Sequence, residues 1–584
     1  MAMNPTLKAE IRRIIHDHKG RWVFSLVAFQ ILPFIEVGLI AIIYAILRLE
    51  DRGTFELLAT KTGLVSAEQA SSPSAIYWVF GFAVLLLLLQ AVLRYAAEIN
   101  LARLRISIYI ENAQHLLDRY FNARIALVRE IGKERIASSV LNDCGAVGDY
   151  VKLRLDLVGG AWGLLLYLAS AIFLSWQVLL VAAAVYALPL YVNRRAYDRM
   201  RQIGKSKVAA QELMLGFFGD ILSGFQRSRM DGLEEALRDE AAGVLNVSQE
   251  WRLNKHLTQT GVRVTLDNLS LFGVVIVIFA GAVVFQLELA ALLLLFVVFT
   301  RMKGFATTIS NSLLEIRSQS PHIERYISLL DDLSGEQPVG GRSAKRPQDP
   351  AATFRTIECR NVEFAYDDDA PVLRDVSLVL EPGDRVLIAG PSGGGKSTLL
   401  EVIAGLLEPD SGTVAYDGQL LDEQLFRRVR SSIAIASPTV HLFRGTVRHN
   451  LSMGIADAEA RIAEAVRLAG LEDALSELPH GLDTILGDDG NQLSLGQRQR
   501  VILARIYLKQ PKLVLLDEAT ANLNPSLEAE IIDRLQSFVC PDCIIVLVSH
   551  KAPENFRYNK RYDMRDGQLA AVYSTIPATA LAGE

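Results

Sequence analysis

The sequence contains little cysteine and little net charge, and each shortage excludes a class of protein. Four cysteines in 584 residues cannot form the framework of a disulfide-stabilised secreted protein, so a compartment that keeps thiols reduced is indicated. The 60 Lys and Arg nearly balance the 65 Asp and Glu, and the net charge of −5 gives no basic field that would favour nucleic acid as a partner. Hydrophobic residues make up 51% of the chain, which excludes a disordered protein.

Apolar sequence is abundant instead, and it is concentrated in the first half of the chain. The apolar runs there are long enough to cross about 30 Å of hydrocarbon as helices. We predict six spanning helices, at Trp22–Leu47, Ala75–Tyr95, Leu155–Trp176, Val178–Val192, Val264–Phe285 and Leu287–Phe305. The first run is too long for a signal peptide and no small-residue cleavage site ends it, so we expect it to be retained. The sequence therefore predicts an all-α six-helix transmembrane domain at residues 1–334.

The loops between these runs differ in length and charge. Those after the second and fourth predicted spans are long and rich in Arg and Lys, whereas Leu49–Ser74 contains more acidic than basic residues. By the positive-inside rule, the N-terminus, the long loops and the C-terminal half are cytoplasmic. We therefore expect a multi-pass protein of a cell inner membrane or plasma membrane, in contact with membrane lipids. Residues 335–352 contain three Pro and three Gly, which predicts a linker to a second domain at residues 353–584.

An apolar strand that runs into a glycine-rich motif predicts a nucleotide site in this second domain. The strand Arg385–Ala389 precedes the motif G-x-x-x-x-G-K-S and a helical pattern. In such a motif, backbone N–H groups cradle phosphate oxygens at a helix N-terminus. We expect Lys396 to reach the β- and γ-phosphates of ATP and Ser397 to bind Mg²⁺. The predicted phosphate-binding residues are Gly390, Pro391, Ser392, Gly393, Gly394, Gly395, Lys396, Ser397 and Thr398.

Two further apolar strands end in residues suited to phosphate chemistry. The strand Leu513–Asp517 is followed by Glu518, and a buried parallel strand delivers residues at its carboxyl end to the ligand crevice. Asp517 is therefore a candidate Mg²⁺ ligand through water, and Glu518 a candidate to polarise the attacking water. The strand Ile544–Val548 leads to His550, a candidate γ-phosphate contact. Buried strands that alternate with helices predict an α/β P-loop NTPase domain.

The order and spacing of these motifs resemble those of the ATP-binding-cassette (ABC) transporters. A membrane domain fused to a nucleotide-binding domain resembles their exporter-type half transporters. The stretch Leu493–Arg500 is similar to the family's signature motif. The resemblance implies that two such domains close head to tail on two ATP molecules. Ser494, Gly496 and Gln497 would then contact a nucleotide that a second half transporter holds.

The resemblance also assigns roles to segments outside these motifs. It implies that Tyr366 stacks on adenine, with an ordinary strand tyrosine as the alternative. It further implies short coupling helices at the tips of the two long cytoplasmic loops. We place them near Phe121–Val128 and Val208–Phe217, although ordinary surface helices have the same sequence pattern.

Three positions depart from the family pattern. Leu495 replaces the first glycine of the usual L-S-G-G-Q, and Asn524 replaces the usual aspartate after the strand that carries Glu518. The family normally has a glutamine that touches the metal, and alignment places Ser437 or Pro438 there. Because family members built from two different chains also combine an intact carboxylate with an altered signature, a homodimer and a heterodimer are equally expected.

The sequence thus predicts an ATP hydrolase that couples hydrolysis to the export or flipping of a substrate, which the sequence does not identify. An ATP-dependent regulator or gated channel is the alternative, because the metal-contacting glutamine is replaced. Two weaker signals remain. Cys540 and Cys543 form a C-x-x-C pair without a second pair, which favours a reduced turn over a zinc site. Glu36, an acid within the first predicted span, is either a cargo contact or a hydrogen-bonded helix contact.

Overall fold

The computed structural model describes residues 13, 16–47, 75–174, 187–189, 191–333, 354–366, 371–487, 490, 492–520, 523–538, 540–549, 553 and 555–572. The chain forms two compact units. The first, called the helical unit here, comprises Met1–Ala123 and Leu127–Val339; the second, called the α/β unit, comprises Arg124–Ala126 and Gly340–Glu584. The predicted linker at 335–352 lies outside the described residues, so the domain boundaries stay a prediction.

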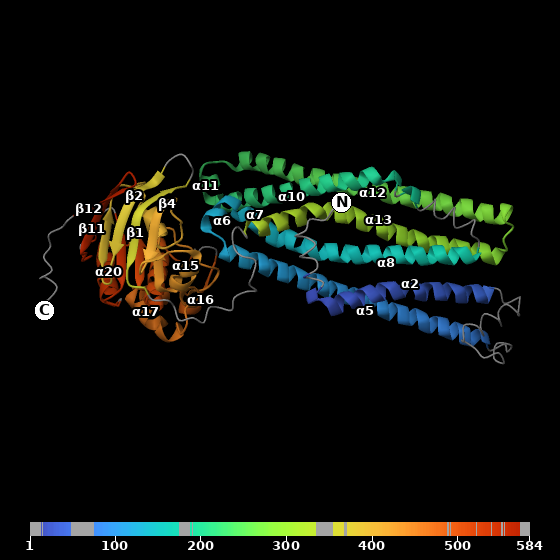
Figure 1. Ribbon diagram of the computed structural model, residues 1–584, viewed down its shortest axis with the longest axis horizontal. Helices are drawn as coiled ribbons and strands as arrows, with labels where there is room; N and C mark the ends of the chain where they lie inside the picture. The colour runs from blue at the N-terminus through green and yellow to red at the C-terminus, as the bar shows by residue number, and fades with distance from the viewer. Residues whose placement is uncertain are drawn as a thin grey trace. The chain divides into compact units, whose positions relative to one another are not determined.

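The helical unit is built from long helices that lie side by side (Figure 1). They are α2 (Lys19–Leu47), α5 (Ala75–Asn122), α8 (Cys144–Leu174), α10 (Arg194–Ser223), α12 (Glu234–Phe279) and α13 (Leu289–Asp332). Short elements connect them: α6 (Ile125–Ile131), α7 (Lys133–Ser138), α11 (Phe225–Met230) and the π-helical turns η1 (Ser139–Asp143) and η2 (Ala280–Val284). The prediction of an all-α first domain is confirmed.

Within the described residues, five helical stretches are long and apolar enough to cross a membrane. They are Lys19–Ile40, Tyr77–Asn122, Lys133–Ser170, Glu234–Val284 and Ala291–Asp332. Five of the six predicted spans lie mainly on these stretches, and the predicted span Val178–Val192 lies largely outside the described residues. The helices extend well beyond the apolar runs, as their periodicity in the long loops predicts.

The predicted positions of the coupling helices had different outcomes. Phe121–Val128 spans the break between α5 and α6, and its role as a coupling helix stays a prediction. The second position is wrong, because Val208–Phe217 lies in the interior of α10 and the chain reverses at α11. Helical spacing continues through the predicted position, and the turn begins only at Gly224, which ends α10.

Small residues let the long helices approach each other closely. A Cβ added at Gly163 of α8 would lie 2.3 Å from the Phe305 ring of α13. A Cβ at Gly204 of α10 would lie 2.4 Å from the backbone oxygen of Ser318. Gly163 therefore accommodates the Phe305 ring, and Gly204 lets the backbones of α10 and α13 approach each other.

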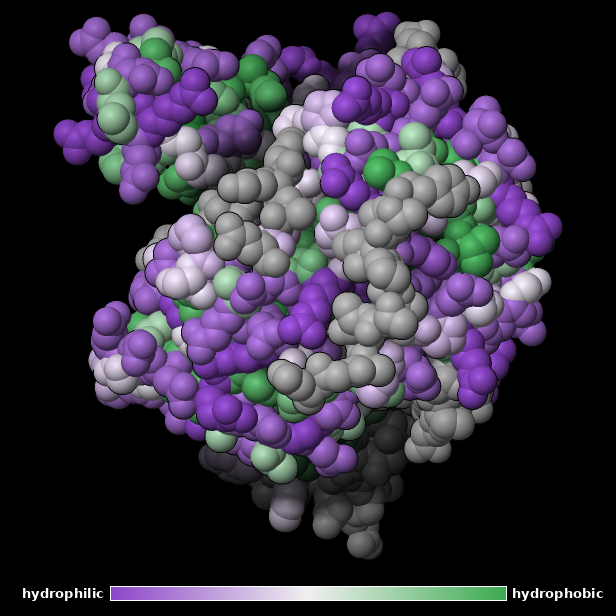
Figure 2. All heavy atoms as spheres, turned by 90° about the vertical axis from the view of Figure 1, so that its left-hand side faces the viewer, coloured by the Kyte–Doolittle hydropathy of each residue, from purple (hydrophilic) through white to green (hydrophobic). Residues whose placement is uncertain are grey.

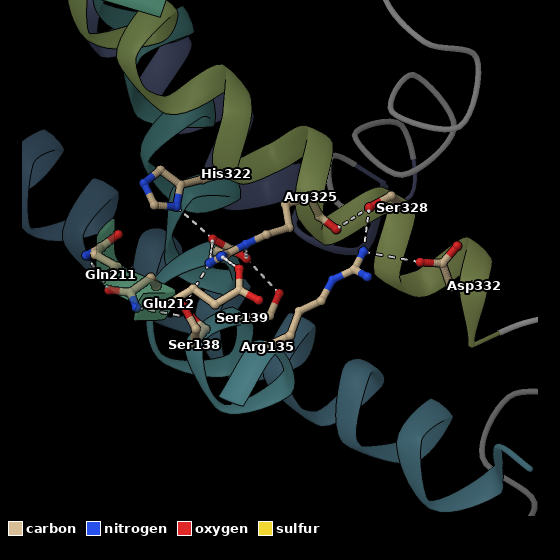
Figure 3. A network of polar contacts seen from close by, with 11 residues as sticks. Arg135, Ser138, Ser139, Gln211, Glu212, His322, Arg325, Ser328 and Asp332 are labelled. Carbon is tan, nitrogen blue, oxygen red and sulfur yellow. Dashed lines mark hydrogen bonds and ion pairs between the residues drawn. The ribbon is translucent and has the colours of Figure 1, made fainter. Parts of the chain in front are cut away.

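A buried polar network joins three parts of the helical unit (Figure 3). Asp143, at the end of η1, is fully buried and accepts hydrogen bonds from Ser139 (2.7 Å) and from Arg325 Nε (2.6 Å). The Nδ1 atom of His322 lies 2.7 Å from the same carboxylate. Arg325 also contacts Glu212 of α10 at 3.2 Å. The network therefore ties η1, α10 and α13 together by charge.

The α/β unit contains a six-stranded sheet in the order β12-β11-β3-β10-β9-β6, parallel except for β12. Its strands are β3 (Arg385–Ala389), β6 (Ile433–Ala436), β9 (Leu513–Asp517), β10 (Ile544–Val548), β11 (Lys560–Arg565) and β12 (Gln568–Val572). The smaller sheets contain β1 (Ile357–Ala365), β2 (Pro371–Leu380), β4 (Ser411–Tyr416), β5 (Gln419–Leu420), β7 (Gly445–Thr446) and β8 (Ile485–Leu486).

The helices of the α/β unit pack on its strands or on one another. They are α14 (Lys396–Ile403), α15 (Glu423–Val429), α16 (Val447–Ser452), α17 (Ile462–Leu468), α18 (Glu472–Ser476), α19 (Leu495–Lys509) and α20 (Pro525–Phe538), with 3₁₀ turns η3 (Arg430–Ser432), η4 (Glu459–Arg461) and η5 (Gly481–Asp483). One apolar core includes α14 and one face of the strands, and a second includes α17, α19 and the other face. The face of the α/β unit in Figure 2 is mostly hydrophilic, with apolar residues in small separate patches. The predicted α/β fold is confirmed.

Candidate nucleotide site

The phosphate loop connects β3 to α14, as the motif predicts. Gly395, the residue before α14, has φ +94, a left-handed conformation that favours glycine. At Gly390 a Cβ would lie 2.1 Å from the backbone oxygen of Met564, so only glycine fits where the loop leaves the strand. By contrast, nothing lies within 4 Å of a Cβ added at Gly393, at the tip of the loop. The glycines thus produce a tight loop with an open side at a helix N-terminus.

Lys396, the first residue of α14, is buried and folds back over the loop. Its ammonium donates hydrogen bonds to the backbone oxygens of Gly390 (3.0 Å) and Pro391 (2.7 Å). These contacts hold a positive charge beside the loop, where a bound polyphosphate needs a counter-charge.

Asp517 and Ser397 meet at the carboxyl end of β9. Asp517 is the last residue of β9 and is only 6% exposed, and the Ser397 hydroxyl donates a hydrogen bond to its carboxylate. Burial raises the pKa of Asp517, and the neighbouring Glu518 adds to the rise, while Ser397 and Lys396 oppose it. A buried carboxylate beside a hydroxyl is the oxygen donor set that Mg²⁺ prefers, so these residues fit the metal.

Glu518 has a backbone conformation that the sequence does not reveal. Its φ of +49 lies in the left-handed region, which costs a residue with a side chain roughly 1–3 kcal/mol. The Glu518 N–H donates to the backbone oxygen of Val548 at 3.1 Å, so the turn after β9 is fixed to the end of β10. Strain of this kind concentrates at functional sites. The fixed turn also holds the backbone of Glu518 in one position beside Asp517.

Tyr366 follows β1 and lies beside the phosphate-loop helix. Its hydroxyl is 3.2 Å from the Thr398 hydroxyl, and its ring packs edge-on against Phe364 at 5.0 Å. The ring is about half exposed, at 51%. An exposed aromatic face next to the phosphate loop is what stacking on a nucleobase requires, and this role stays a prediction.

His550 lies outside the described residues. The residue before it, Ser549, donates its N–H to the backbone oxygen of Ile388 at 3.3 Å. The end of β10 therefore lies beside the end of β3, close to the start of the phosphate loop.

The signature residues lie in a different part of the α/β unit. Ser494 caps α19: its side chain accepts a hydrogen bond from the Gln497 N–H, and the Gln497 side chain accepts one from the Ser494 N–H. Gly496 occupies the second position of this helix. The helix packs on α16, α17 and β6, whereas α14 packs on β2 and β9. The structure thus brings the phosphate loop, Asp517 and Tyr366 together and places the signature on another element.

Leu495 does not disturb this cap. It is the first residue of α19, its side chain is 41% exposed, and both hydrogen bonds of the capping box form around it. The substitution therefore leaves the turn intact, and any effect arises from the side chain that it adds to the surface.

Ser437 lies next to Asp517 at the carboxyl ends of β6 and β9. In the parallel pair of β6 and β9, Ala436 is opposite Leu516, so the next residues along the two strands, Ser437 and Asp517, are neighbours. Side chains alternate along strands, and Ile433 shares its core with Leu513 and α14, so Ser437 continues the face that Asp517 uses. Of the two positions that the alignment left open, Ser437 and not Pro438 is adjacent to Asp517.

Asn524 caps α20, which begins with a proline. Its side-chain oxygen accepts a hydrogen bond from the Leu527 N–H at 2.8 Å. Asn and Asp are equally good at this position, so the departure from the family preserves the local structure.

Glu36 is held by neighbours on three other helices. Its carboxylate accepts hydrogen bonds from Gln90 of α5 (2.7 Å) and Tyr167 of α8 (3.1 Å), and Arg301 of α13 lies 3.9 Å away. The Glu36 side chain is only 13% exposed. These contacts favour the hydrogen-bonded helix contact over the cargo contact.

Sequence reasoning missed two features of the candidate site. One is the strained backbone of Glu518, for which a single sequence holds no signal. The other is the adjacency of Ser437 and Asp517. It could not be predicted because the sequence of a single strand does not specify its register with a neighbouring strand.

Comparison with known proteins supports these assignments at the level of the domain and the fold. A family model described as ABC transporter matches residues 373–521. A multidrug resistance ABC transporter ATP-binding and permease protein of Lactococcus lactis is 30% identical over 285 residues, which are 48% of this chain and 47% of that protein. An ATP-dependent lipid A-core flippase of Syntrophus aciditrophicus is 27% identical over 419 residues, 69% of this chain and 66% of that protein.

A solved structure extends the likeness to nearly the whole chain. The structure of a bacterial Atm1-family ABC exporter with ATP bound superimposes with a TM-score of 0.75 and covers 94% of each chain at 18% identity. Matches to the two curated relatives above span from about half to two thirds of the length of those proteins.

Proposed function

The chain carries an ABC transporter domain behind a helical unit with the fold of an ABC exporter, and from this premise we propose that it is one half of an ATP-driven exporter. The observation that carries the proposal is the meeting of Ser397 and Asp517 beside the phosphate loop, in a chain whose other unit consists of membrane-length helices. An ATPase site joined to such helices has the parts needed to convert hydrolysis into movement across a bilayer.

In the proposed reaction, water attacks the γ-phosphate of ATP in line with the leaving group. The N–H groups at the open tip of the phosphate loop bind the phosphate oxygens, and Lys396 leaves its two carbonyl partners to neutralise their charge. Glu518 orients the attacking water and accepts its proton. Tyr366 stacks on the base, and His550 contacts the γ-phosphate.

We further propose a Mg²⁺ site at the carboxyl edge of the sheet. Ser397 would hold the ion through its hydroxyl and Asp517 through water, and Mg²⁺ would supply charge neutralisation on the phosphates. Ser437, the neighbour of Asp517, has a hydroxyl where the family has a glutamine amide, and this hydroxyl donates to the backbone oxygen of Thr439 at 3.2 Å. A serine reaches less far than a glutamine, so its contact with the site is weaker.

The working unit is proposed to contain two chains. Because the signature residues lie on α19, apart from the phosphate loop on α14, one α/β unit cannot enclose a nucleotide with both. A second half transporter supplies the missing contact, with Ser494, Gly496 and Gln497 facing its nucleotide. A homodimer and a heterodimer remain equally expected.

For the location and the cargo, we draw on sequence and on the relatives. The positive charge of the long loops supports a cytoplasmic α/β unit, and we propose that the helical unit lies in a cell inner membrane or plasma membrane. Relatives are named as a multidrug resistance transporter and as lipid A-core flippases. We therefore propose an amphipathic cargo that moves outward from the membrane or its inner surface.

Transport in vesicles tests this proposal. The purified chain is reconstituted in vesicles of phosphatidylethanolamine and phosphatidylglycerol with two probes, a fluorescent cationic amphipathic dye and a lipid labelled on its headgroup. We expect ATP to drive movement of at least one probe, and Glu518→Gln to abolish it. Hydrolysis that moves neither probe would contradict the proposal of export and favour the regulator or gated channel.

A further inference from the structure

Cys540 and Cys543 are the ends of one tight turn between α20 and β10. The Cys543 N–H donates a hydrogen bond to the backbone oxygen of Cys540 at 2.8 Å. A turn of this kind keeps the first and fourth Cα atoms within about 7 Å. Disulfides join Cα atoms about 4.4–6.8 Å apart, so the turn holds the Cα atoms of the two cysteines near the separation that a disulfide needs.

The first thiol of the turn is accessible and has a cationic neighbour. Cys540 is exposed, and the Lys512 ammonium lies 3.9 Å from its sulfur. The backbone of Lys512 is fixed, because its N–H donates to Ser432 (2.7 Å) and its carbonyl accepts from Ile544 (2.9 Å). Reactive cysteines are characteristically exposed and lie beside Lys, Arg or His.

The second thiol has the opposite environment. Cys543 is fully buried, and burial raises the pKa of its thiol to about 12, although Arg385 and Lys512 act in the other direction. The Arg385 guanidinium also donates to the Cys543 backbone oxygen. Burial shields this thiol from external oxidants. Cys540, its neighbour across the turn, is therefore the residue with which Cys543 would form a disulfide. An accessible cysteine next to a resolving cysteine is the arrangement of thiol redox sites.

The other two cysteines differ from Cys540 in exposure, and a metal site at the turn is the alternative to a dithiol. Cys144 and Cys359 are both buried, one in the core of the helical unit and one in the core of the α/β unit. Within the described ranges, no group of three or more His, Cys, Asp and Glu side chains could hold a metal ion. The turn is therefore distinguished by its pair of thiols, one exposed and one buried.

We propose that Cys540 and Cys543 form a redox-active dithiol that closes reversibly to a disulfide with low-molecular-weight disulfides such as oxidised glutathione. The Cys540 thiolate attacks one glutathione sulfur, forms a mixed disulfide and releases one glutathione thiolate. The Cys543 thiol leaves the backbone oxygen of Ile544, which lies 3.5 Å from its sulfur, and gives its proton to water. Its thiolate then attacks the Cys540 sulfur, which forms the internal disulfide and releases the second glutathione thiolate. The dithiol loses two electrons and one oxidised glutathione gains them. In a reducing cytoplasm the pair stays open.

A glutathione titration of the full chain in lipid nanodiscs tests the proposal. The reduced protein is equilibrated near neutral pH with glutathione buffers from fully reduced to fully oxidised, quenched with acid, alkylated after denaturation and analysed by peptide mass spectrometry. We expect the 540–543 disulfide to rise from almost none to almost complete, and dithiothreitol to reverse it. Cys144 and Cys359 should stay reduced, and Cys359→Ser should leave the titration unchanged.

Two variants separate the steps. Cys543→Ser should accumulate a glutathione adduct on Cys540 that the wild type does not retain, and Cys540→Ser should form neither product. The proposal is overturned if Cys540 remains a free thiol in the most oxidised buffer. It is also overturned if the wild type retains the glutathione adduct to the same extent as Cys543→Ser, because Cys543 then does not displace glutathione from Cys540. The readout is thiol chemistry, so failure here is distinguishable from failure of the proposed transport.

Discussion

The helical unit and the α/β unit both bury acidic side chains, but they surround them differently. Asp143 accepts from Ser139 and Arg325 and contacts His322, so protein groups meet its carboxylate from several elements. Asp517 lies at the end of a strand, with Ser397 as a hydrogen-bond donor and the phosphate loop beside it. A carboxylate paired on several sides holds helices together, whereas one at a sheet edge is placed to meet a ligand.

The two units also differ in how much of their apolar surface they bury. In α5, only 6% of the most apolar 18-residue window is buried within the helical unit. The α/β unit instead presents a mostly hydrophilic face (Figure 2) and buries its apolar residues on both sides of its sheet. Lipid tails solvate apolar side chains, so a helix in a bilayer needs no apolar core of its own.

The largest effect should come from breaking the Asp143 network. Asp143→Asn removes the buried carboxylate that pairs with Arg325 and leaves only the contact with Glu212 at 3.2 Å; removing one partner of a buried pair typically costs about 3–5 kcal/mol. Asp332→Asn is the matched control, because Asp332 pairs with Arg135 at a half-exposed position and should cost less than about 1 kcal/mol. Unfolding of both variants in detergent measures the difference, and equal losses would show that burial of the network contributes nothing.

The next effect concerns catalysis in the α/β unit. Glu518→Gln should lower ATP turnover at least about a hundredfold, since it removes the group that orients water, and should keep ATP binding. Lys396→Ala should weaken nucleotide binding itself. Turnover and binding of a fluorescent ATP analogue distinguish the two. Undiminished hydrolysis by Glu518→Gln would refute its assignment.

The third prediction concerns the signature. Leu495→Gly should cost at most about 0.5–1 kcal/mol of stability, the penalty for glycine in the middle of a helix, because Leu495 is the first residue of α19. If the leucine hinders contact with a partner's nucleotide, the variant expressed alone should hydrolyse ATP faster. A chain that dimerises alone, turns over at about 1 s⁻¹ or faster and gains nothing from glycine would eliminate the heterodimer.

The fourth prediction tests how Glu36 is used. Glu36→Gln changes an acceptor of two hydrogen bonds between spanning helices, and such bonds average about 0.6 kcal/mol. We expect a small loss of thermal stability with basal ATPase activity near wild type. A change in probe-stimulated ATPase activity at unaltered stability would instead support contact with cargo.

The smallest effect is expected at Asn524. Asn524→Asp should change stability by no more than a few tenths of a kcal/mol, because both residues cap α20 equally well. ATP turnover measured beside stability then isolates the effect of the added charge on the site. A stability change above about 1 kcal/mol would mean that the cap is not the role of this residue.

Local signals made much of the α/β unit predictable. The phosphate loop was predictable because the strand, the glycines and the helix follow one another in the sequence. The conformation of the loop depends on those glycines themselves. Asp517 and Glu518 were found for the same reason, since a short apolar strand ends directly at them. The prediction of the second coupling helix failed because helical periodicity alone does not say where a long helix reverses.

Neighbouring residues encode five of the six predicted spans, the buried strands and the phosphate loop, so the sequence alone was enough to locate them. The contacts of Ser437 with Asp517, of Asp143 with Arg325 and of Cys540 with Lys512 join segments far apart in the chain and became visible only in the folded units. Those contacts depend on strand register and helix packing. Register and packing minimise the free energy of the whole unit, so no single segment specifies them.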